Sequence, residues 1–355
     1  MIENVLSLIH NHDRFFITTH IRPDGDALGS ELAFGLFLRK LGKDVVMLNS
    51  DPPPMNMDWL PELGRVEVFD GSLEQRKKID AADVLFILDT NALDRLGKLV
   101  GPVRNARGVK ALIDHHTRPE AWFDVKYVRE TASSTGELIY EIIAAHDPHL
   151  IDAEIATALY SAIMTDTGSF RFSNVTPAVH RVVADLLERG SISAEPIHTA
   201  IYDTRTPESL RLLSRVLDTI TLRHGGKIAY AVITPRVLNE TGAASEDADG
   251  FVNYALSIEG VVAAVQFLET EGGTKMSFRS KSDVHVNEWA RAFGGGGHKN
   301  AAGAYLTVPL TEAIEQVISA APRYIALGNE DEEKAISDED ASYLATLIEM
   351  KSQEK

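Results

Sequence analysis

The sequence predicts an α/β protein: an N-terminal, doubly wound, mostly parallel sheet followed by a smaller α+β domain. Three observations predict this class. They are short apolar runs that resemble buried parallel strands, a helical pattern between the first two runs, and a second group of strands in the last third of the chain. With 355 residues, the chain is long enough for two domains.

Five short apolar runs, rich in Val, Ile and Phe, carry the first part of this prediction. They are FFITT at 15–19, DVVMLN at 44–49, VEVF at 66–69, VLFILD at 84–89 and VKALID at 109–114. Between the first two runs, residues 30–42 have a helical pattern that ends at Gly42, a residue suited to the position after a helix. A strand, a helix and a strand in this order predict neighbouring parallel strands.

The remaining patterns set the expected domain boundaries. Further helices are predicted at 134–146, 153–164, 177–190 and near 250–258, and further strands at 227–234, 261–270 and 274–280. We therefore expect a first domain over residues 1–190, a linker with a short helix over 191–206, a second domain over 207–327 and an acidic tail over 328–355.

Composition excludes several classes of function. The chain has no cysteine, which excludes disulfides, zinc–thiolate sites and thiol nucleophiles, so any metal must be held by nitrogen and oxygen. The formal charge of −17 argues against a broad basic surface for long duplex nucleic acid. We find neither an apolar stretch of membrane length nor the pattern of a signal peptide, and we expect a cytoplasmic protein without a membrane partner.

Acidic and histidine side chains follow several of the predicted elements. They lie at the ends of strands or of a helix, in four segments: His20, Asp24 and Asp26 in HIRPDGDALGS; Asp89 in ILDTNALDRLG; Asp114, His115 and His116 in IDHH; and Asp166 in MTDTGSF. Ligands in open parallel sheets collect beyond the carboxyl ends of the strands, so we expect these side chains to meet at one edge.

Carboxylates brought together in this way repel one another unless cations neutralise them. Six of these side chains would suit two divalent metals that share a bridging carboxylate: His20, Asp24, Asp26, Asp89, His115 and Asp166. Their mixture of nitrogen and oxygen favours Mn²⁺ over Ca²⁺, with Mg²⁺ as a second choice and zinc or iron less suited. Taken singly, the PDGD turn could be a solvated loop or a helix N-cap, and DHH could be a surface turn.

The four segments together resemble the motifs of the DHH phosphoesterase superfamily, and RSKSDVHVNEWARAFGGGGHKNAAG (279–303) resembles its DHHA1 domain. Within the superfamily, the chain is most similar to the bifunctional oligoribonuclease and pAp phosphatase group. The resemblance implies His20 and Asp24 on one manganese ion, Asp26, His115 and Asp166 on the other, and Asp89 between them. It also implies that His116 lies near the scissile phosphate and that Asp114 orients a ligand histidine.

The glycine-rich segment FGGGGHKNAAG lacks the Lys-Ser or Lys-Thr pair of a P-loop, and by itself it could be a flexible loop. Glycines also leave backbone N–H groups open to a phosphate, and an arginine can grip a phosphate through two hydrogen bonds. The resemblance to DHHA1 implies a substrate-binding role for Arg279, Ser280, Gly296, Gly297 and His298, with the active site in a cleft between the two domains.

Three functions remain compatible with these residues. The first is hydrolysis of short RNA to mononucleotides together with removal of the 3′-phosphate of pAp; the second is hydrolysis of cyclic di-AMP or pApA; the third is a nucleotide sensor without activity. Short RNA or small nucleotides are the expected partners, and a homodimer is compatible with the sequence. Arg95 and Arg171 could lie at the rim of the site or in surface pairs.

Overall fold

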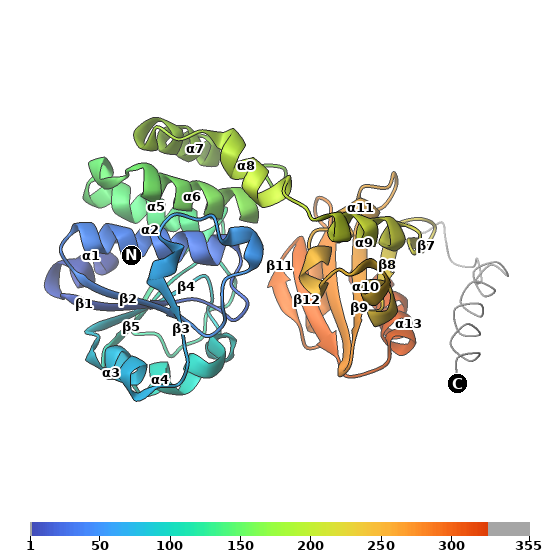
Figure 1. Cartoon of the computed structure of the whole chain (residues 1–355), viewed down its shortest axis with the longest axis horizontal. Coiled ribbons are helices and arrows are strands. Elements are labelled where there is room, and N and C mark those ends of the chain that lie inside the picture. Colours follow the sequence, from blue (N-terminus) through green and yellow to red (C-terminus); the bar gives the residue numbers. More distant parts are fainter. Residues whose placement is uncertain (1, 326–355) are drawn as a thin grey trace. The chain divides into compact units, whose positions relative to one another are not determined.

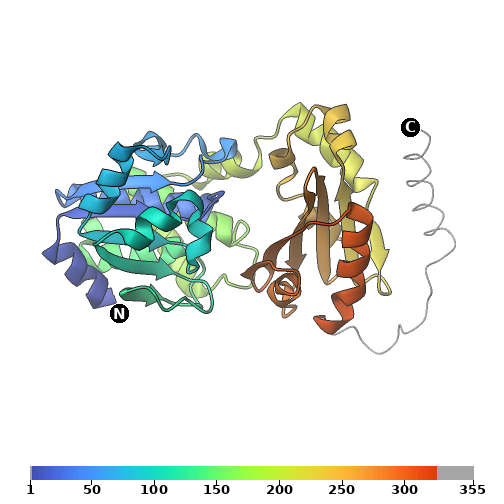
Figure 2. The same ribbon diagram turned by 90° about the horizontal axis from the view of Figure 1, so that it is seen from below.

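The computed structural model describes residues 2–325, so the predicted acidic tail at 328–355 lies outside the described residues. The chain forms two compact units that divide between Thr204 and Arg205 (Figures 1 and 2). The segment predicted as a linker, 191–206, contains helix α8 (Ala194–Tyr202), whose Ile197 is buried in the core of the first unit. None of the helices in residues 2–325 has the length and apolar character needed to cross a bilayer.

The first unit is built around a sheet of six strands, all parallel, in the order β3-β2-β1-β4-β5-β6. The strands are β1 (Arg14–Thr18), β2 (Asp44–Asn49), β3 (Val66–Val68), β4 (Val84–Leu88), β5 (Val109–Asp114) and β6 (Val125–Val128). The helices are α1 (Ile2–Asn11), α2 (Gly25–Lys40), α3 (Leu73–Ala81), α4 (Val100–Asn105), α5 (Thr135–His146), α6 (Ala153–Asp166), α7 (Pro177–Gly190) and α8.

Helices cover both faces of this sheet, as the prediction of a doubly wound sheet requires. Helices α2, α5 and α6 lie over one face and α3 and α4 over the other (Figure 1). The two layers have separate apolar cores, because successive side chains of a strand point to opposite faces: Phe15 and Phe86 belong to one core, and Phe16 and Leu85 to the other. The predicted parallel α/β class is confirmed.

Helix α2 begins at Gly25, five residues before the predicted start, so Asp26 belongs to the helix. Asp24 is its N-cap, and Oδ1 of Asp24 accepts hydrogen bonds from the backbone N–H groups of Asp26 and Ala27. Gly25 is required by close packing, since a Cβ atom there would lie 2.6 Å from Oγ1 of Thr165 in α6. The N-cap alternative therefore describes this turn, and we show below that it is compatible with a ligand role.

The second unit has a mixed sheet of six strands in the order β11-β12-β10-β9-β8-β7, in which only the β8–β9 pair is parallel. Its strands are β7 (Thr221–Arg223), β8 (Ile228–Ile233), β9 (Ala263–Thr270), β10 (Gly273–Ser280), β11 (Gly296–His298) and β12 (Ala301–Leu306). Its helices are α9 (Pro207–Leu217), α10 (Pro235–Thr241), α11 (Val252–Leu256), α12 (Val286–Arg291) and α13 (Leu310–Ala320).

The glycine-rich segment differs from the expected loop, because Gly296 and Gly297 form edge strand β11, which pairs with β12. Absence of side chains makes this pairing possible. A Cβ atom on Gly295 would lie 2.1 Å from the carbonyl oxygen of Gly303, and one on Gly297 would lie 2.5 Å from that of Ala301. The glycines therefore permit a close approach of two backbones.

Candidate metal centre

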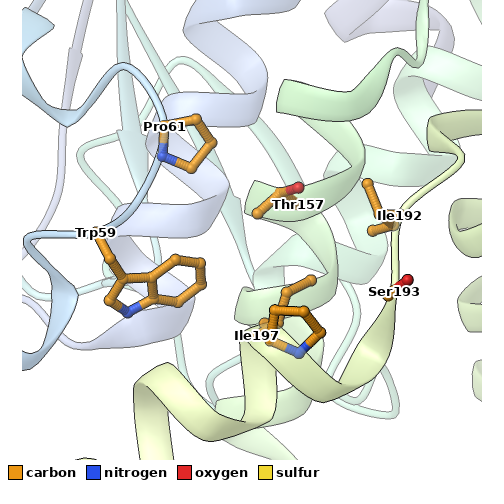
Figure 3. Close-up of a pocket in the computed structure, with 7 residues that line it drawn as sticks. Trp59, Pro61, Thr157, Ile192, Ser193 and Ile197 are labelled. Carbon is orange, nitrogen blue, oxygen red and sulfur yellow. The ribbon is translucent and has the colours of Figure 1, made fainter.

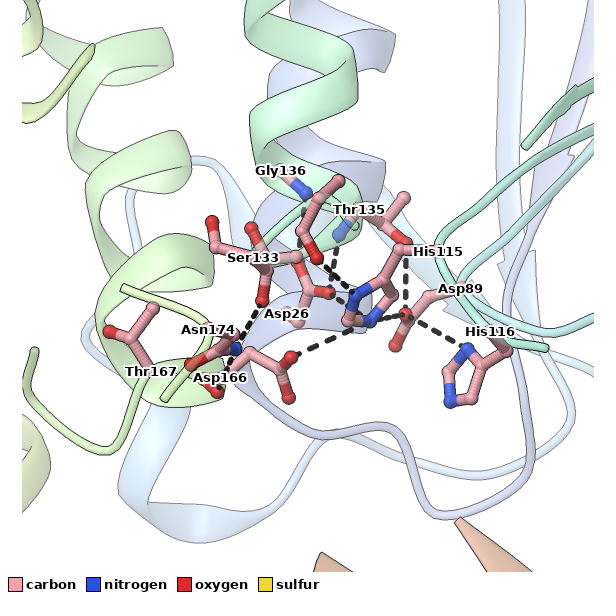
Figure 4. Close-up of polar contacts among 12 residues, drawn as sticks. Asp26, Asp89, His115, His116, Ser133, Thr135, Gly136, Asp166, Thr167 and Asn174 are labelled. Atoms are coloured by element: carbon pink, nitrogen blue, oxygen red, sulfur yellow. Dashed lines mark hydrogen bonds and ion pairs between the residues drawn. The ribbon is translucent and has the colours of Figure 1, made fainter. Parts of the chain in front are cut away.

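The candidate centre lies at the carboxyl ends of the three central strands of the first sheet. His20 lies two residues beyond β1, Asp89 directly follows β4, and His115 directly follows β5. In the strand order of this sheet, β1 and β4 flank the point at which the direction of winding reverses, and ligands of doubly wound proteins bind there. Asp26 at the start of α2 and Asp166 at the end of α6 complete the cluster (Figure 4).

Asp89 occupies the middle of this cluster. Its Oδ2 lies 3.4 Å from Nε2 of His20, whereas its Oδ1 lies 3.5 Å from Nε2 of His115. Thr135 donates a hydrogen bond from Oγ1 to the same Oδ1 at 2.9 Å. Asp89 has a left-handed backbone conformation, with φ at 57°, which costs energy for residues other than glycine. One carboxylate thus presents one oxygen to each of two histidines.

Both histidines are oriented in the way that metal-binding imidazoles usually are. Nδ1 of His20 lies 2.8 Å from the carbonyl oxygen of Ile21, and Nδ1 of His115 lies 3.3 Å from that of Ala132. A carbonyl oxygen can only accept, so each Nδ1 carries a proton, and each Nε2, which faces the carboxylates, is the nitrogen that can bind either a cation or a second proton. Both rings are buried, with 4% of each residue exposed.

The remaining carboxylates divide into two groups. Oδ2 of Asp24 lies 3.9 Å from Nε2 of His20, on the exposed side of the cluster. Oδ2 of Asp26 lies 3.6 Å and Oδ2 of Asp166 3.5 Å from Nε2 of His115. Asp24 can fulfil both roles discussed for it, because Oδ1 caps α2 while Oδ2 faces His20.

The separations of 3.4 to 3.9 Å fit ligands of a common ion. They exceed the length of a good hydrogen bond, whereas two ligand atoms bound to one divalent ion at about 2.1 Å lie about 3 to 4 Å apart, depending on the angle between the two bonds. Two sets of ligand atoms, those of His20, Asp24 and Asp89 and those of Asp26, His115 and Asp166, each lie within 4.8 Å of one another. The donor set therefore fits two divalent cations.

The first turn of α5 holds Asp26 in place. Its Oδ2 accepts a hydrogen bond from the backbone N–H of Thr135 at 2.7 Å, and its Oδ1 accepts from that of Gly136 at 2.9 Å (Figure 4). These donors belong to the positive end of a helix, which favours a carboxylate. Ser30 adds a third donor to Oδ1.

The buried carboxylates of the cluster shift one another's pKa values and that of His115. Burial, followed by the charge of Asp89, raises the pKa of Asp26 well above its usual value. Burial also raises the pKa of Asp166 to about 6. Burial alone would lower the pKa of His115, but the charge of Asp166 and the interaction with Asp89 outweigh it and raise that pKa strongly. Cations bound among these carboxylates would supply the positive charge that the raised pKa values otherwise draw from protons.

Asp114 and His116 form a separate pair beside the cluster. His116 donates from Nδ1 to Oδ1 of Asp114 at 2.7 Å, and Asp114 is fully buried. That Asp114 orients a ligand histidine remains a prediction; the hydrogen bond of Asp114 goes to His116, whereas Nδ1 of His115 lies 3.3 Å from the carbonyl oxygen of Ala132. Nδ1 of His116 also lies 3.8 Å from Oδ1 of Asp89. The pair therefore orients an imidazole that stands next to the ligands.

Sequence reasoning missed the residues that support the ligands. Thr135 bonds to Asp89, and Asn174 donates from Nδ2 to the carbonyl oxygens of Ser133 and Asp166. A signal for the first was present, since Ser134 and Glu137 have the spacing of a capping box, which marks a helix start at this point. Nothing comparable marks Asn174.

The five candidate substrate-binding residues of the second unit lie on two strands, β10 and β11, which flank β12. Arg279 in β10 is opposite Ala301 in β12, and Ala301 is opposite His298 in β11. Ser280 ends β10 and donates from Oγ to the carbonyl oxygen of Val284 at 2.6 Å, while Gly296 and Gly297 complete β11. The structure thus brings these five residues together at one end of the strands.

A cavity elsewhere in the first unit has no comparable chemistry. It measures about 420 Å³ and lies between Trp59 and Pro61 on one side and Pro196 and Ile197 of α8 on the other (Figure 3). Among the described residues, its lining contains neither a carboxylate nor a histidine. The metal centre, rather than this cavity, is the candidate for catalysis.

The fold and this centre define a DHH-type phosphoesterase, and comparison with known proteins agrees. Residues 14–163 match the DHH family, N-terminal domain, and residues 225–327 match the DHHA1 domain. The chain is 36% identical to the bifunctional oligoribonuclease and PAP phosphatase NrnA of Thermus thermophilus, over 86% of this chain and 88% of that protein. The chain therefore belongs to the DHH family, in the branch that carries a DHHA1 domain, and the resemblance stated from the motifs is confirmed.

Two further relatives are informative. The crystal structure of an exopolyphosphatase-related protein from Bacteroides fragilis superimposes with a TM-score of 0.85 at 30% identity, over 91% of this chain and 97% of that one. The cyclic-di-AMP phosphodiesterase PdeA of Listeria monocytogenes is 27% identical, over 89% of this chain but 48% of that protein. By their names, both NrnA and PdeA hydrolyse phosphoester bonds.

Proposed function

We propose that this protein is a metal-dependent phosphoesterase that hydrolyses short oligoribonucleotides to mononucleotides and removes the 3′-phosphate of pAp. The relationship to NrnA over most of both chains supports this substrate class. The single observation that carries the reaction type is the Asp89 carboxylate, whose two oxygens face His20 and His115 at 3.4 and 3.5 Å.

In this proposal, His20 and Asp24 bind one cation, Asp26, His115 and Asp166 bind the other, and Asp89 contacts both. A donor set of imidazole and carboxylate without sulfur suits Mn²⁺, with Mg²⁺ as the second choice. When bound, two such cations lower the pKa of a water molecule and neutralise charge on phosphoryl oxygens. The N–H groups of α5 and the hydroxyl of Thr135 fix the carboxylates in advance, so that little reorganisation is required.

His116 and Asp114 have a separate role in this proposal. The hydrogen bond to Asp114 keeps a proton on Nδ1 of His116 and fixes the ring, so Nε2 can exchange a proton with the substrate. As an imidazolium, the ring would stabilise a nonbridging phosphoryl oxygen or protonate the leaving oxygen. Both roles require the orientation that Asp114 imposes.

The second unit would bind the nucleotide. Arg279 offers a guanidinium that can hold a phosphate in bidentate geometry. Its alignment with Ala301 and His298 across the sheet, two strands away, supports a nucleotide site that uses both the guanidinium and the imidazole. We find no long basic, aromatic-lined track in the sequence, which favours substrates of a few nucleotides over long single strands.

A second candidate substrate is supported by one observation. The similarity to PdeA covers 89% of this chain. Five of the six proposed ligands, His20, Asp24, Asp26, Asp89 and His115, lie within the matched DHH domain, and the proposed nucleotide-binding residues lie within the matched DHHA1 domain. Hydrolysis of cyclic di-AMP or of its product pApA would use the same two cations and the same nucleotide site.

A substrate panel tests the proposal. Purified protein is incubated with pAp, pApA, cyclic di-AMP and a five-nucleotide RNA, in Mn²⁺, in Mg²⁺ and in chelator, and the products are separated by liquid chromatography. We expect pAp and the RNA to be turned over fastest in Mn²⁺ and nothing to react in chelator. Preference for the cyclic dinucleotide would replace the first candidate by the second. Nucleotide binding without turnover of any substrate would contradict both and indicate a sensor.

A further inference from the structure

Two arginines beside the metal centre have no acidic partner. Arg22 follows His20 in the loop after β1, and Arg95 lies in the loop after β4; the first is exposed and the second half-buried. Within residues 2–325, neither guanidinium takes part in a side-chain hydrogen bond or an ion pair. Several other arginines do, as in the pairs of Arg14 with Asp83 and of Arg129 with Glu137.

The backbone beneath these two side chains is fixed by hydrogen bonds. Ile21 donates its N–H to the carbonyl oxygen of Arg95 at 2.7 Å, which joins the two loops next to His20. Arg22 has a left-handed backbone, with φ at 52°, and Asp51 holds it there by accepting its N–H at 2.9 Å. A side chain held by an otherwise unfavourable backbone is more common at functional sites than elsewhere.

Gly97 locks the second loop against the first. Its left-handed backbone, with φ at 56°, suits glycine, and a Cβ atom there would lie 2.4 Å from Cγ2 of Ile21 and 2.6 Å from Oγ of Ser50. Ser50 also accepts the N–H of Lys98 at 2.9 Å. The loops after β1, β2 and β4 therefore form one rigid edge that presents Arg22 and Arg95.

Arg95 lies close to the His20 group of ligands. Its carbonyl oxygen accepts the N–H of Ile21, the residue directly after His20. Arg95 thus lies near His20, Asp24 and Asp89 without an ion pair to either carboxylate, as expected of a cation that binds an anionic ligand.

We propose that Arg22 and Arg95 form a binding site for a second phosphate group of the substrate, next to the phosphate that is hydrolysed. This inference rests on the proposed function and specifies its substrates: nucleotides with two or more phosphates are preferred to those with one. The second phosphate is either a 5′-phosphate, as in pAp, or the next internucleotide phosphate of an RNA. Two guanidiniums about one phosphate can each donate two hydrogen bonds.

Paired substrates test the proposal. The first pair is pAp and 3′-AMP, which differ by a 5′-phosphate; the second is ApApA and ApA, which differ by an internucleotide phosphate. We measure kcat and KM in Mn²⁺ for the wild type, Arg95→Gln, Arg95→Lys and Arg22→Gln. The control is Arg107→Gln, an exposed arginine two residues before β5, at the opposite edge of the sheet.

We expect Arg95→Gln to lower kcat/KM for the two-phosphate member of one pair by about 10- to 100-fold, mainly through KM, since a charged hydrogen bond is lost. The one-phosphate member should change much less. Arg95→Lys should lose less, because the charge remains while bidentate geometry is lost. The pair that responds identifies the source of the phosphate. An unchanged ratio in both pairs, or an equal loss for Arg107→Gln, would overturn the proposal.

Binding separates this inference from the proposed function. Equilibrium dialysis of pAp and 3′-AMP against each variant in Mn²⁺, with any hydrolysis followed in parallel, reports the phosphate site even where the substrate is not turned over. If the wild type hydrolyses neither compound but binds pAp more tightly, and Arg95→Gln removes that preference, the inference stands and the proposed function fails. If the wild type hydrolyses both and Arg95→Gln leaves their binding ratio unchanged, the inference alone fails.

Discussion

The buried Glu31 in α2 yields a quantitative prediction for stability. Its side chain is fully buried, and Oε2 accepts a hydrogen bond from Nδ2 of Asn49 at 2.5 Å. In turn, Oδ1 of Asn49 accepts the N–H of Thr19, the residue before His20. Within the part of the chain that the structure describes, Oε1 of Glu31 has no hydrogen-bond partner. Burial raises the pKa of this carboxyl from 4.5 to about 8.

The sign of the effect follows from the two states of the chain. Between about pH 4.5 and pH 8, the folded protein keeps a proton on Glu31 that the unfolded chain releases, so the wild type loses stability as the pH rises through this range. Above pH 8 both states are ionised and the loss is complete. Glu31→Gln preserves the acceptor for Asn49 but cannot ionise. Relative to the wild type, the variant should gain about 4 kcal/mol between about pH 5 and pH 9.

This difference is measured by unfolding both proteins in urea at several pH values, in chelator. Unfolding is followed by hydrogen-exchange mass spectrometry of peptides from β1 and α2. Any constant cost of burying the amide cancels, because only the change with pH is compared. Glu130→Gln, in an exposed turn, is the control and should show no such trend. A difference between Glu31→Gln and the wild type that stays constant over this range would refute the assignment of a protonated, buried carboxyl.

Three further predictions concern the site and its support. Asp89→Asn should lower kcat by at least ~100-fold and weaken Mn²⁺ binding in calorimetry, whereas Asp80→Asn on the exposed side of α3 should change neither. Asp114→Asn should lower kcat without weakening Mn²⁺ binding, because His116 loses its orientation; a loss of affinity would contradict this role. Gly29→Ala should destabilise the first unit by about 1 to 3 kcal/mol in urea unfolding, because its Cβ would lie 2.4 Å from the carbonyl oxygen of Ala158 in α6; unchanged stability would argue against the close contact of α2 and α6.

Strands in the centre of the first sheet could be predicted from the sequence because helices cover both of its faces. The predicted strands at 44–49 and 109–114 match β2 and β5. These strands carry apolar residues, such as Val45 and Ile113, toward both faces of the sheet, which gives a continuous apolar run in the sequence. Strand β6 (Val125–Val128) was missed, because it is a short, half-buried strand at the sheet edge. Strands β11 and β12 consist largely of glycine and alanine, which give no strand signal.

The convergence of the ligands could be predicted because strand ends share one edge, whereas their supporting contacts could not. The hydrogen bond from Thr135 to Asp26 joins residues 109 apart in sequence. The bond of Asn49 to Glu31 likewise depends on how β2 lies against α2. Such pairs leave no local pattern, so they become visible only when the packing of helices on the sheet is known.

Through the two oxygens of its carboxylate, Asp24 couples the binding of a cation to the stability of the first turn of α2. Because Oδ1 holds the amides of Asp26 and Ala27 while Oδ2 faces His20, any ion that fixes this carboxyl also tightens the first winding of α2. These two amide protons should exchange with solvent more slowly once the ion arrives. They therefore provide a local gauge of occupancy that needs no substrate at all.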